Sequence, residues 1–307
     1  MIRVVLAVTF FVFRLTPRRL AVVGGRAAGW LMEHVFHFRT DVVDLQLQRV
    51  YGDTGKRSQT EIAAIRHGVY RHFGLLLFET LRLPGADLEP YRQLVTVEGR
   101  EHLDAALARG KGVMLINAHV GNWELGAISV VQAGYDLCAV SKEMRSPVVQ
   151  TAMDMLRQTT GLDTFYRRNS ARKILRALRQ NRAVVMVIDQ NMIDTEGEFV
   201  EFFGYPACTM TAVASLAERI GAAVVPVCCY RQPDLMSHQT VIWPALELEF
   251  PHDDREANIL HNTQRHTEAI EQMIERHPDQ WNWIHKRWRT RPPDEQVNPF
   301  DYKRGLE

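Results

Sequence analysis

A histidine and a glutamate, five positions apart, stand where an apolar stretch of this sequence ends. Residues 115–118 lead directly into His119, and Glu124 follows beyond Gly121. An imidazole that donates one ring N–H to a carboxylate can use its other nitrogen to remove a proton from a hydroxyl group. The spacing therefore offers the base and the orienting carboxylate of a catalytic triad, with no protein nucleophile in the same pattern.

Positioning this pair requires a strand that turns sharply into a helix. Residues 112–118 are mostly apolar, as in a buried strand, and Gly121 permits a tight turn. Asn122 suits the N-cap of a helix that carries Glu124 in its first turn. Ligands of open α/β sheets bind beyond the carboxyl ends of the strands, where this turn would lie. Taken alone, the pair is more simply explained by a core histidine and a glutamate near a helix N-terminus.

Other chemistries have less support in the sequence. No H-E-x-x-H motif or third ligand accompanies His119, so we expect no metal site. The four cysteines show no C-x-x-C spacing and are predicted to be small core residues in a reducing compartment. No glycine-rich phosphate loop follows a predicted strand, which argues against a nucleotide-binding enzyme. The net charge of +1 does not indicate a binder of polyanions.

The rest of the chain predicts an α/β fold, with a mixed central sheet flanked by helices. Residues 36–307 form the predicted catalytic domain, in which a helical lead-in runs to about residue 90 and the α/β core spans about 94–250. Predicted strands lie at 112–118, 137–140, 163–168, 183–189 and 222–231, and predicted edge strands lie at 238–244 and 246–250. Predicted helices lie at 122–134, 146–161, 170–181, 209–221 and 254–278.

Residues 1–35 predict a helical part that associates with a membrane. Residues 4–13 are strongly apolar but too few to span a bilayer, which takes about 20 residues. We favour a helix in the membrane interface, with Arg14, Arg18 and Arg19 facing anionic headgroups; a signal peptide and an ordinary buried helix are the alternatives. Near the other end of the chain, Trp281, Trp283 and Trp288 alternate with cationic side chains, which we also interpret as a bilayer-interface pattern rather than a nucleic-acid site.

Several stretches together resemble one family. N-A-H-V-G-N-W-E, at residues 117–124, resembles the H-x-x-x-x-(D/E) motif of the lysophospholipid acyltransferase superfamily, and more narrowly of the bacterial lipid A biosynthesis acyltransferases. That family includes lauroyl and myristoyl transferases and mycobacterial phosphatidylinositol mannoside acyltransferases. Similar blocks follow in family order as far as Trp288: F-Y-R-R-N-S-A-R-K, V-V-M-V-I-D-Q-N, E-F-F-G-Y-P and H-P-D-Q-W-N-W-I-H-K-R-W. Ordered blocks make coincidence improbable, so the catalytic interpretation of the pair is favoured.

The resemblance implies an acyl transfer in which His119 is the general base and Glu124 its partner. The base would activate a hydroxyl of a lipid acceptor, which attacks the thioester of acyl carrier protein or coenzyme A, with no metal or bound redox cofactor. A lipid A precursor is the favoured acceptor, at the cytoplasmic face of the inner membrane, with the protein peripheral or singly anchored. The alternatives are a phosphatidylinositol mannoside, a lysophospholipid, a lipoamino acid, or a non-catalytic lipid-binding role.

The resemblance also implies roles for polar residues elsewhere. Arg168, and with it Arg167, would contact phosphate or the thioester side of the donor. Asp189 and Gln190 end a predicted strand and would position the acceptor or the basic segment, although Asp189 could equally cap a helix.

Three further residues complete the predicted substrate site. Asn122 belongs to this site. Its backbone N–H and that of Gly121 are candidates to stabilise the oxyanion that develops on the thioester carbonyl during acyl transfer. Phe203 and Gly204 would line a groove for the acyl chain, although aromatic pairs such as Phe202 and Phe203 are more often simple core.

Overall fold

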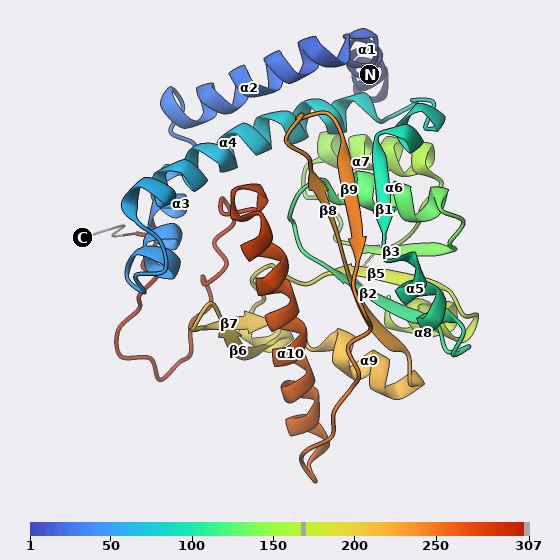
Figure 1. The fold of residues 1–307 in the computed structure, drawn as a ribbon, viewed down its shortest axis with the longest axis vertical. Helices are drawn as coiled ribbons and strands as arrows, with labels where there is room; N and C mark the ends of the chain where they lie inside the picture. The colour runs from blue at the N-terminus through green and yellow to red at the C-terminus, as the bar shows by residue number, and fades with distance from the viewer. Residues whose placement is uncertain (167–169, 304–307) are drawn as a thin grey trace.

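A seven-stranded mixed sheet forms the centre of the molecule (Figure 1). The computed structural model describes residues 1–166 and 170–303. From edge to edge the strands are β1 (Val95–Glu98), β9 (His238–Ile242), β8 (Ala223–Arg231), β2 (Val113–Asn117), β5 (Ala183–Val187), β3 (Leu137–Ser141) and β4 (Asp163–Tyr166). The five strands from β8 to β4 are mutually parallel, while β9 is antiparallel to β8 and parallel to β1. The predicted mixed α/β sheet is confirmed.

Helices cover both faces of the sheet because the central strands are apolar on both sides. Along β2, Met114 and Ile116 face one core and Val113 and Leu115 face the other, as the period of two requires. The first core is closed by α8 (Ala171–Arg179), α9 (Ala212–Ile220) and α10 (Arg255–Arg276). The second is closed by α5 (Arg100–Leu107) and α6 (Trp123–Gln132), and α7 (Pro147–Thr160) packs beside α6.

Two predicted edge strands differ from the structure. Residues 238–242 form β9, but β1 covers its outer side, so it is an inner strand. Residues 246–250 form no strand; only Leu246 makes an isolated bridge, to Val224. There the amide side chain of Asn262 on α10 accepts from the backbone N–H of Glu249 (2.9 Å) and donates to its carbonyl oxygen (2.7 Å). A side chain thus satisfies backbone groups that a neighbouring strand would otherwise bind.

The N-terminal helices lie across the helical lead-in (Figure 1). The N-terminal helices are α1 (Ile2–Leu15) and α2 (Arg18–His34). The helical lead-in comprises α3 (Thr40–Leu47), the π-turn η1 (Gln48–Gly52), α4 (Gln59–Arg82) and the 3₁₀ turn η2 (Glu89–Gln93). Helix α2 packs closely on α4 through glycines: a Cβ at Gly74 would lie 2.0 Å from the carbonyl oxygen of Gly25, and one at Gly29 would lie 2.3 Å from that of Tyr70. Within the described residues, no helix is both long and apolar enough to cross a membrane.

The tryptophan-rich C-terminal segment is core, so its interpretation as a bilayer-interface pattern is wrong. Trp281, Trp283 and Trp288 are at most 1% exposed, and Arg287 is fully buried. Their rings pack on a hairpin of β6 (Glu198–Phe202) and β7 (Tyr205–Thr209). The short turn η3 (Asp194–Glu196) precedes this hairpin in the chain, and η4 (Pro278–Gln280) precedes Trp281. The Arg287 guanidinium donates to the carbonyl oxygen of Cys208 (2.8 Å), and burial lowers its pKa to about 10.

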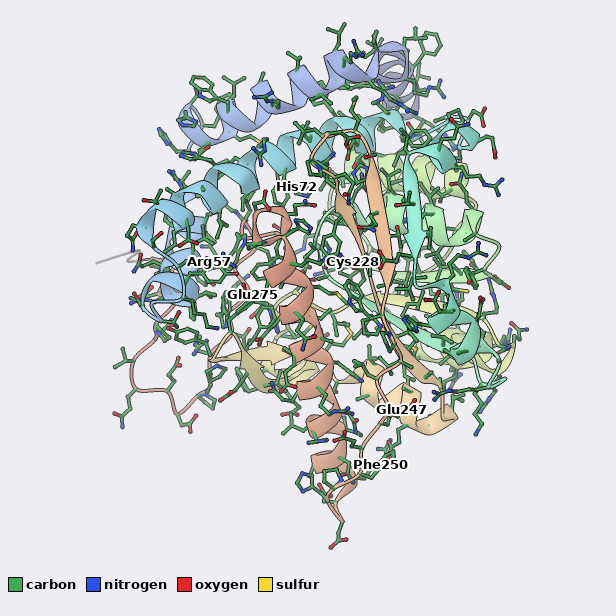
Figure 2. The ribbon with its side chains drawn as sticks, in the orientation of Figure 1. Arg57, His72, Cys228, Glu247, Phe250 and Glu275 are labelled. Atoms are coloured by element: carbon green, nitrogen blue, oxygen red, sulfur yellow. The ribbon has the colours of Figure 1, made fainter. Side chains whose placement is uncertain are left out.

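Helix α10 is tied to the helical lead-in by an ion pair. Arg57 and Glu275 lie 2.9 Å apart, and Figure 2 shows their side chains between the two segments. The segment after α10 contacts the turn that follows β2, where Val120 and Trp281 form an isolated bridge.

Candidate active site

The turn after β2 holds His119 in a fixed backbone conformation. The carbonyl oxygen of Gln280 accepts from the N–H of Gly121 (3.0 Å), and that of Cys229 accepts from the N–H of Asn122 (2.8 Å). Gly121 has a φ of 60°, and a Cβ there would lie 1.9 Å from the carbonyl oxygen of Cys229. Only glycine fits this close approach, as the sequence predicted. The same bonds occupy the two backbone N–H groups proposed as oxyanion donors, so that proposal is not supported.

The carboxylate that orients the imidazole is Asp189. Its Oδ1 lies 2.7 Å from Nδ1 of His119, and its Oδ2 accepts from the His119 backbone N–H (2.8 Å) and from Nε1 of Trp281 (2.7 Å). Because an ionised carboxylate only accepts hydrogen bonds, Nδ1 carries the hydrogen, and in the neutral imidazole Nε2 then has the lone pair. Burial by itself raises the pKa of Asp189, but the imidazole and these hydrogen bonds outweigh it and hold that pKa at about 2.

Strand register explains why Asp189 reaches the ring. Asn117 on β2 pairs with Val187 on β5, so His119 and Asp189, each two residues further on, emerge side by side at the sheet edge. The ring also packs edge-on against Trp123, with centroids 4.8 Å apart. Its Nε2 lies 3.3 Å from the amide nitrogen of Gln190.

Glu124 is engaged elsewhere than expected. Its carboxylate forms a two-pronged ion pair with Arg157 of α7, at 2.6 and 3.2 Å. Asn122 caps α6 as predicted, accepting from the N–H of Leu125 at 3.0 Å. In the first turn of that helix Glu124 faces α7, and it is 5% exposed. The predicted contact between Glu124 and the imidazole is therefore replaced by two pairs, His119–Asp189 and Glu124–Arg157.

A cavity of about 530 Å³ opens beside these two pairs. Polar side chains on its wall include His119, Glu124, Arg157 and Gln190. Apolar side chains from the sheet and from α6 also line it, among them Leu115, Val130, Leu137, Ala139 and Val185. Leu115 lies four residues before His119 on the same strand face, so the apolar lining reaches about 13 Å from the histidine. The cavity can therefore hold an extended apolar chain with its polar end at the imidazole.

The cysteines near the cavity are not suited to act as nucleophiles. All four are free and buried, which confirms the prediction of small core residues. Burial raises the pKa of Cys229 to about 12 and that of Cys228 well above its ordinary value. Both thiols stay protonated at neutral pH.

The structure does not place the other predicted substrate residues at the cavity. Phe203 and Gly204 form the turn between β6 and β7, and the Phe203 ring packs on Tyr51 and Trp283 in the core. The side chain lies in the aromatic core, away from the cavity lining, because the tryptophan-rich segment packs over the hairpin. Arg167 and Arg168 lie outside the described residues, so their predicted role stands as a prediction.

A buried polar network behind the turn was not predicted. Asn122 donates through Nδ2 to Glu79 of α4 (2.8 Å), and Glu79 forms a two-pronged ion pair with Arg231 of β8. His72 lies 3.1 Å from the carbonyl oxygen of Gly121, and burial lowers its pKa to about 3, so it donates as a neutral imidazole (Figure 2). The sequence held one indication of this network, a glutamate within the apolar pattern of residues 75–83.

Comparison with known proteins identifies relatives of one kind. The family model described as bacterial lipid A biosynthesis acyltransferase matches residues 2–290. A phosphatidylinositol mannoside acyltransferase of Mycobacterium tuberculosis is 28% identical over 222 residues, covering 70% of this chain and 67% of the relative. A lipid A biosynthesis palmitoleoyltransferase of Escherichia coli is 28% identical over 227 residues, covering 74% and 72%. A lipid A biosynthesis lauroyltransferase of the same species is 27% identical, covering 64% and 62%.

Proposed function

The chain belongs to the bacterial lipid A biosynthesis acyltransferase family, and we propose that it moves a fatty acyl chain from an acyl thioester to a hydroxyl of a membrane glycolipid. It is an acyltransferase, as its named relatives are. A lipid A precursor is the favoured acceptor. A phosphatidylinositol mannoside is the second candidate, because a transferase named for that acceptor is as similar to this chain as one named for lipid A.

The observation that carries the proposal is the Asp189–His119 pair, whose histidine lines a cavity with a largely apolar wall. Nε2 of the imidazole removes the proton of the acceptor hydroxyl as its oxygen attacks the thioester carbonyl carbon. The tetrahedral intermediate collapses when the C–S bond breaks, and the imidazolium returns the proton to the leaving thiolate. Asp189 fixes the ring tautomer and stabilises the imidazolium that forms between the two steps.

Arg157 is the cationic donor that we assign to the developing oxyanion. Two of its N–H groups are held by Glu124, and the guanidinium lines the cavity. A charged donor fixed in place before the reaction stabilises an oxyanion without reorganisation. On this assignment Glu124 positions Arg157, while Asp189 orients the base.

The acyl chain of the donor occupies the apolar part of the cavity. Leu115, Leu137, Ala139 and Val185 supply the apolar surface that such a chain requires. The donor is the thioester of acyl carrier protein or coenzyme A. The enzyme acts at the cytoplasmic face of the inner membrane, with exposed apolar residues of α1 and α2 against the bilayer: Val4, Val5, Val8, Phe11, Val12, Leu20 and Val23.

The direct test is acyl transfer by the purified protein. Acyl carrier protein thioester or acyl-coenzyme A is supplied with a lipid A precursor or a phosphatidylinositol mannoside in mixed micelles, and products are identified by mass. We expect one acceptor to gain the mass of one acyl chain, and His119→Ala to lose this product. Wild-type rates in the His119→Ala variant would exclude the mechanism. Tight lipid binding without turnover on any donor would favour a non-catalytic lipid-binding role.

A further inference from the structure

A second concave site lies between the N-terminal helices and the loop that follows α4. Its volume is about 490 Å³, and it is open to solvent. The lining side chains include three arginines and three apolar or aromatic residues: Arg14, Arg18, Arg82, Phe11, Leu15 and Tyr91. We call this site the α1–α2 groove. None of its residues has a part in the acyl-transfer chemistry described above.

The arginines of the groove hold their positions without acidic partners. Arg82 donates to the carbonyl oxygen of Phe13 at the end of α1 (2.8 Å), and Arg14 donates to carbonyl oxygens of the loop after α4. The guanidinium of Arg18 lies 5.5 Å from the centre of the Tyr91 ring. Throughout residues 1–166 and 170–303, no carboxylate forms an ion pair with any of these three arginines, although Asp87 also lines the groove. The groove is therefore cationic and suited to an anion.

The N-terminus of α2 adds a second source of positive potential. The helix begins after Pro17 with no side-chain cap and with no acidic residue in its first turn. Its first intrahelical bond runs from the N–H of Ala21 to the carbonyl oxygen of Pro17 (3.0 Å), so the N–H groups of residues 18–20 have no helical acceptor. Such a terminus favours a bound anion, because its free N–H groups and the positive end of the helix dipole both face outward from the start of the helix.

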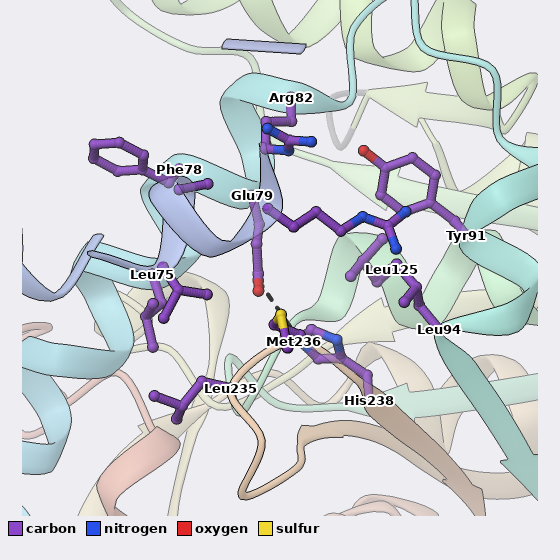
Figure 3. Close-up of a pocket in the computed structure, with 13 residues that line it drawn as sticks. Leu75, Phe78, Glu79, Arg82, Tyr91, Leu94, Leu125, Leu235, Met236 and His238 are labelled. Atoms are coloured by element: carbon purple, nitrogen blue, oxygen red, sulfur yellow. Dashed lines mark ion pairs between the residues drawn. The ribbon is translucent and has the colours of Figure 1, made fainter. Parts of the chain in front are cut away.

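A small cavity of about 40 Å³ extends inward from the groove and shares Arg18, Arg82 and Tyr91 with it (Figure 3). His238 lines this cavity and is 2% exposed; its Nε2 lies 3.6 Å from a carboxylate oxygen of Glu79, whereas its Nδ1 has no hydrogen-bond partner among the described residues. The view shows His238 on the opposite side of the cavity from Arg82 and Tyr91. A buried polar atom is normally hydrogen-bonded, so the unpartnered Nδ1 of His238 points to a ligand or water oxygen.

We propose that the α1–α2 groove binds the phosphate group of an anionic membrane lipid. A lipid is favoured over free phosphate because Phe11 and Leu15, 51% and 67% exposed, continue the groove into the apolar face of α1. That surface can cover acyl chains while the arginines and the α2 N-terminus bind the phosphate. The proposal deepens the proposed function and rests on its membrane-bound lipid acceptor.

The small inner cavity lies beside the catalytic cavity. Glu79 and Leu125 line the small inner cavity, while their chain neighbours Thr80 and Glu124 line the catalytic cavity. One turn of α4 and the start of α6 therefore separate the two.

Vesicle binding by the full chain tests this proposal with a matched pair of variants. Arg18 lines the groove, whereas Arg19 is exposed on the same turn and does not line it. Affinity is measured by flotation with phosphatidylcholine vesicles that contain phosphatidic acid, or an equal negative charge supplied by oleate. We expect Arg18→Gln to weaken binding to phosphatidic acid vesicles about tenfold or more, through lost charge-assisted hydrogen bonds. Arg19→Gln should weaken it less than about fivefold, as expected for one surface charge.

Each alternative result overturns the assignment. Equal losses in both variants, or equal affinity of the wild type for the two vesicle types, would show unspecific attraction to negative charge. If inorganic phosphate stabilises the wild type against heating as much as phosphatidic acid vesicles do, the groove is a site for free phosphate. Arg14→Gln provides a second groove variant if Arg18→Gln does not fold. His119→Ala should bind vesicles normally, so failure of the groove and failure of the catalytic proposal give different results.

Discussion

Exchanging Asp189 for asparagine tests which acidic residue serves the imidazole. Asp189→Asn removes one charge and preserves size, and Glu124→Gln is its matched counterpart. Asparagine can turn its NH₂ group toward Nδ1 of His119, which forces the ring hydrogen onto Nε2 and removes the lone pair that acts as base. The corresponding exchange in the serine protease triad costs about 10⁴ in kcat. We therefore expect Asp189→Asn to lose about 10³- to 10⁴-fold in kcat, or about 4–5 kcal/mol in the barrier.

The same exchange also has a stability effect whose sign follows from the pKa. The folded-state pKa of Asp189 is about 2, below its ordinary value of 3.8, so the folded protein favours the carboxylate. This difference contributes about 2 kcal/mol of stability that is present above about pH 4 and is lost as the pH falls through 2. Asp189→Asn should lower the free energy of unfolding by a similar amount at neutral pH. Both variants should be assayed well below their thermal midpoints.

The assay is the pH dependence of kcat/KM for acyl transfer. In Asp189→Asn the residual activity should extend to lower pH, because the imidazolium has lost its carboxylate partner. Glu124→Gln should lower kcat about 10- to 100-fold, through a looser Arg157, and leave the acid limb unchanged. The reasoning is refuted if Glu124→Gln moves the acid limb while Asp189→Asn stays within tenfold of the wild-type rate.

Three further predictions address the surroundings of the site. Trp281→Phe keeps the buried ring but removes its donor to Asp189 (2.7 Å), so the free energy of unfolding should fall by about 2 kcal/mol in denaturant titrations; an unchanged value would contradict the role of this hydrogen bond. Ala139→Leu narrows the catalytic cavity, so competition between donors of different length should shift toward shorter acyl chains, and an unchanged preference would place the chain elsewhere. Burial lowers the pKa of His266 from 6.5 to about 4, so the unfolded chain binds a proton at higher pH than the folded protein does. The free energy of unfolding should therefore fall by about 3 kcal/mol as the pH drops through this interval. His266→Gln should reduce this pH dependence in unfolding measured from pH 7 to pH 4.

Local patterns were sufficient to predict most elements around the site. The strand before His119 and the cap at Asn122 follow from an apolar run, a glycine and an amide side chain in sequence. Helix α7 begins at Pro147 after the N-cap Ser146 and ends at Thr160 with Gly161 as its C-cap, where the residue types predict it. These features depend on interactions between residues that are close in the chain, so they can be predicted from a single sequence.

The Trp281–Trp288 segment could not be assigned in this way. Aromatic and cationic side chains in alternation suit a membrane surface as well as a protein core, and composition does not distinguish them. The tertiary structure distinguishes them. After α10 the Trp281–Trp288 segment packs on the β6–β7 hairpin, where its aromatic rings lie in the core and Trp281 donates to Asp189.

By itself, the sequence determined that His119 ends a buried strand, that Gly121 and Asn122 turn the chain into a helix, and that the chain resembles an acyltransferase. Only the tertiary structure decided which carboxylate serves the imidazole. Glu124 is near His119 in the chain, but its helix aims it at Arg157. Asp189 is 70 residues away, yet the pairing of β2 with β5 brings it to 2.7 Å from the ring. Strand order is a property of the whole sheet, and no spacing along the chain encodes it locally.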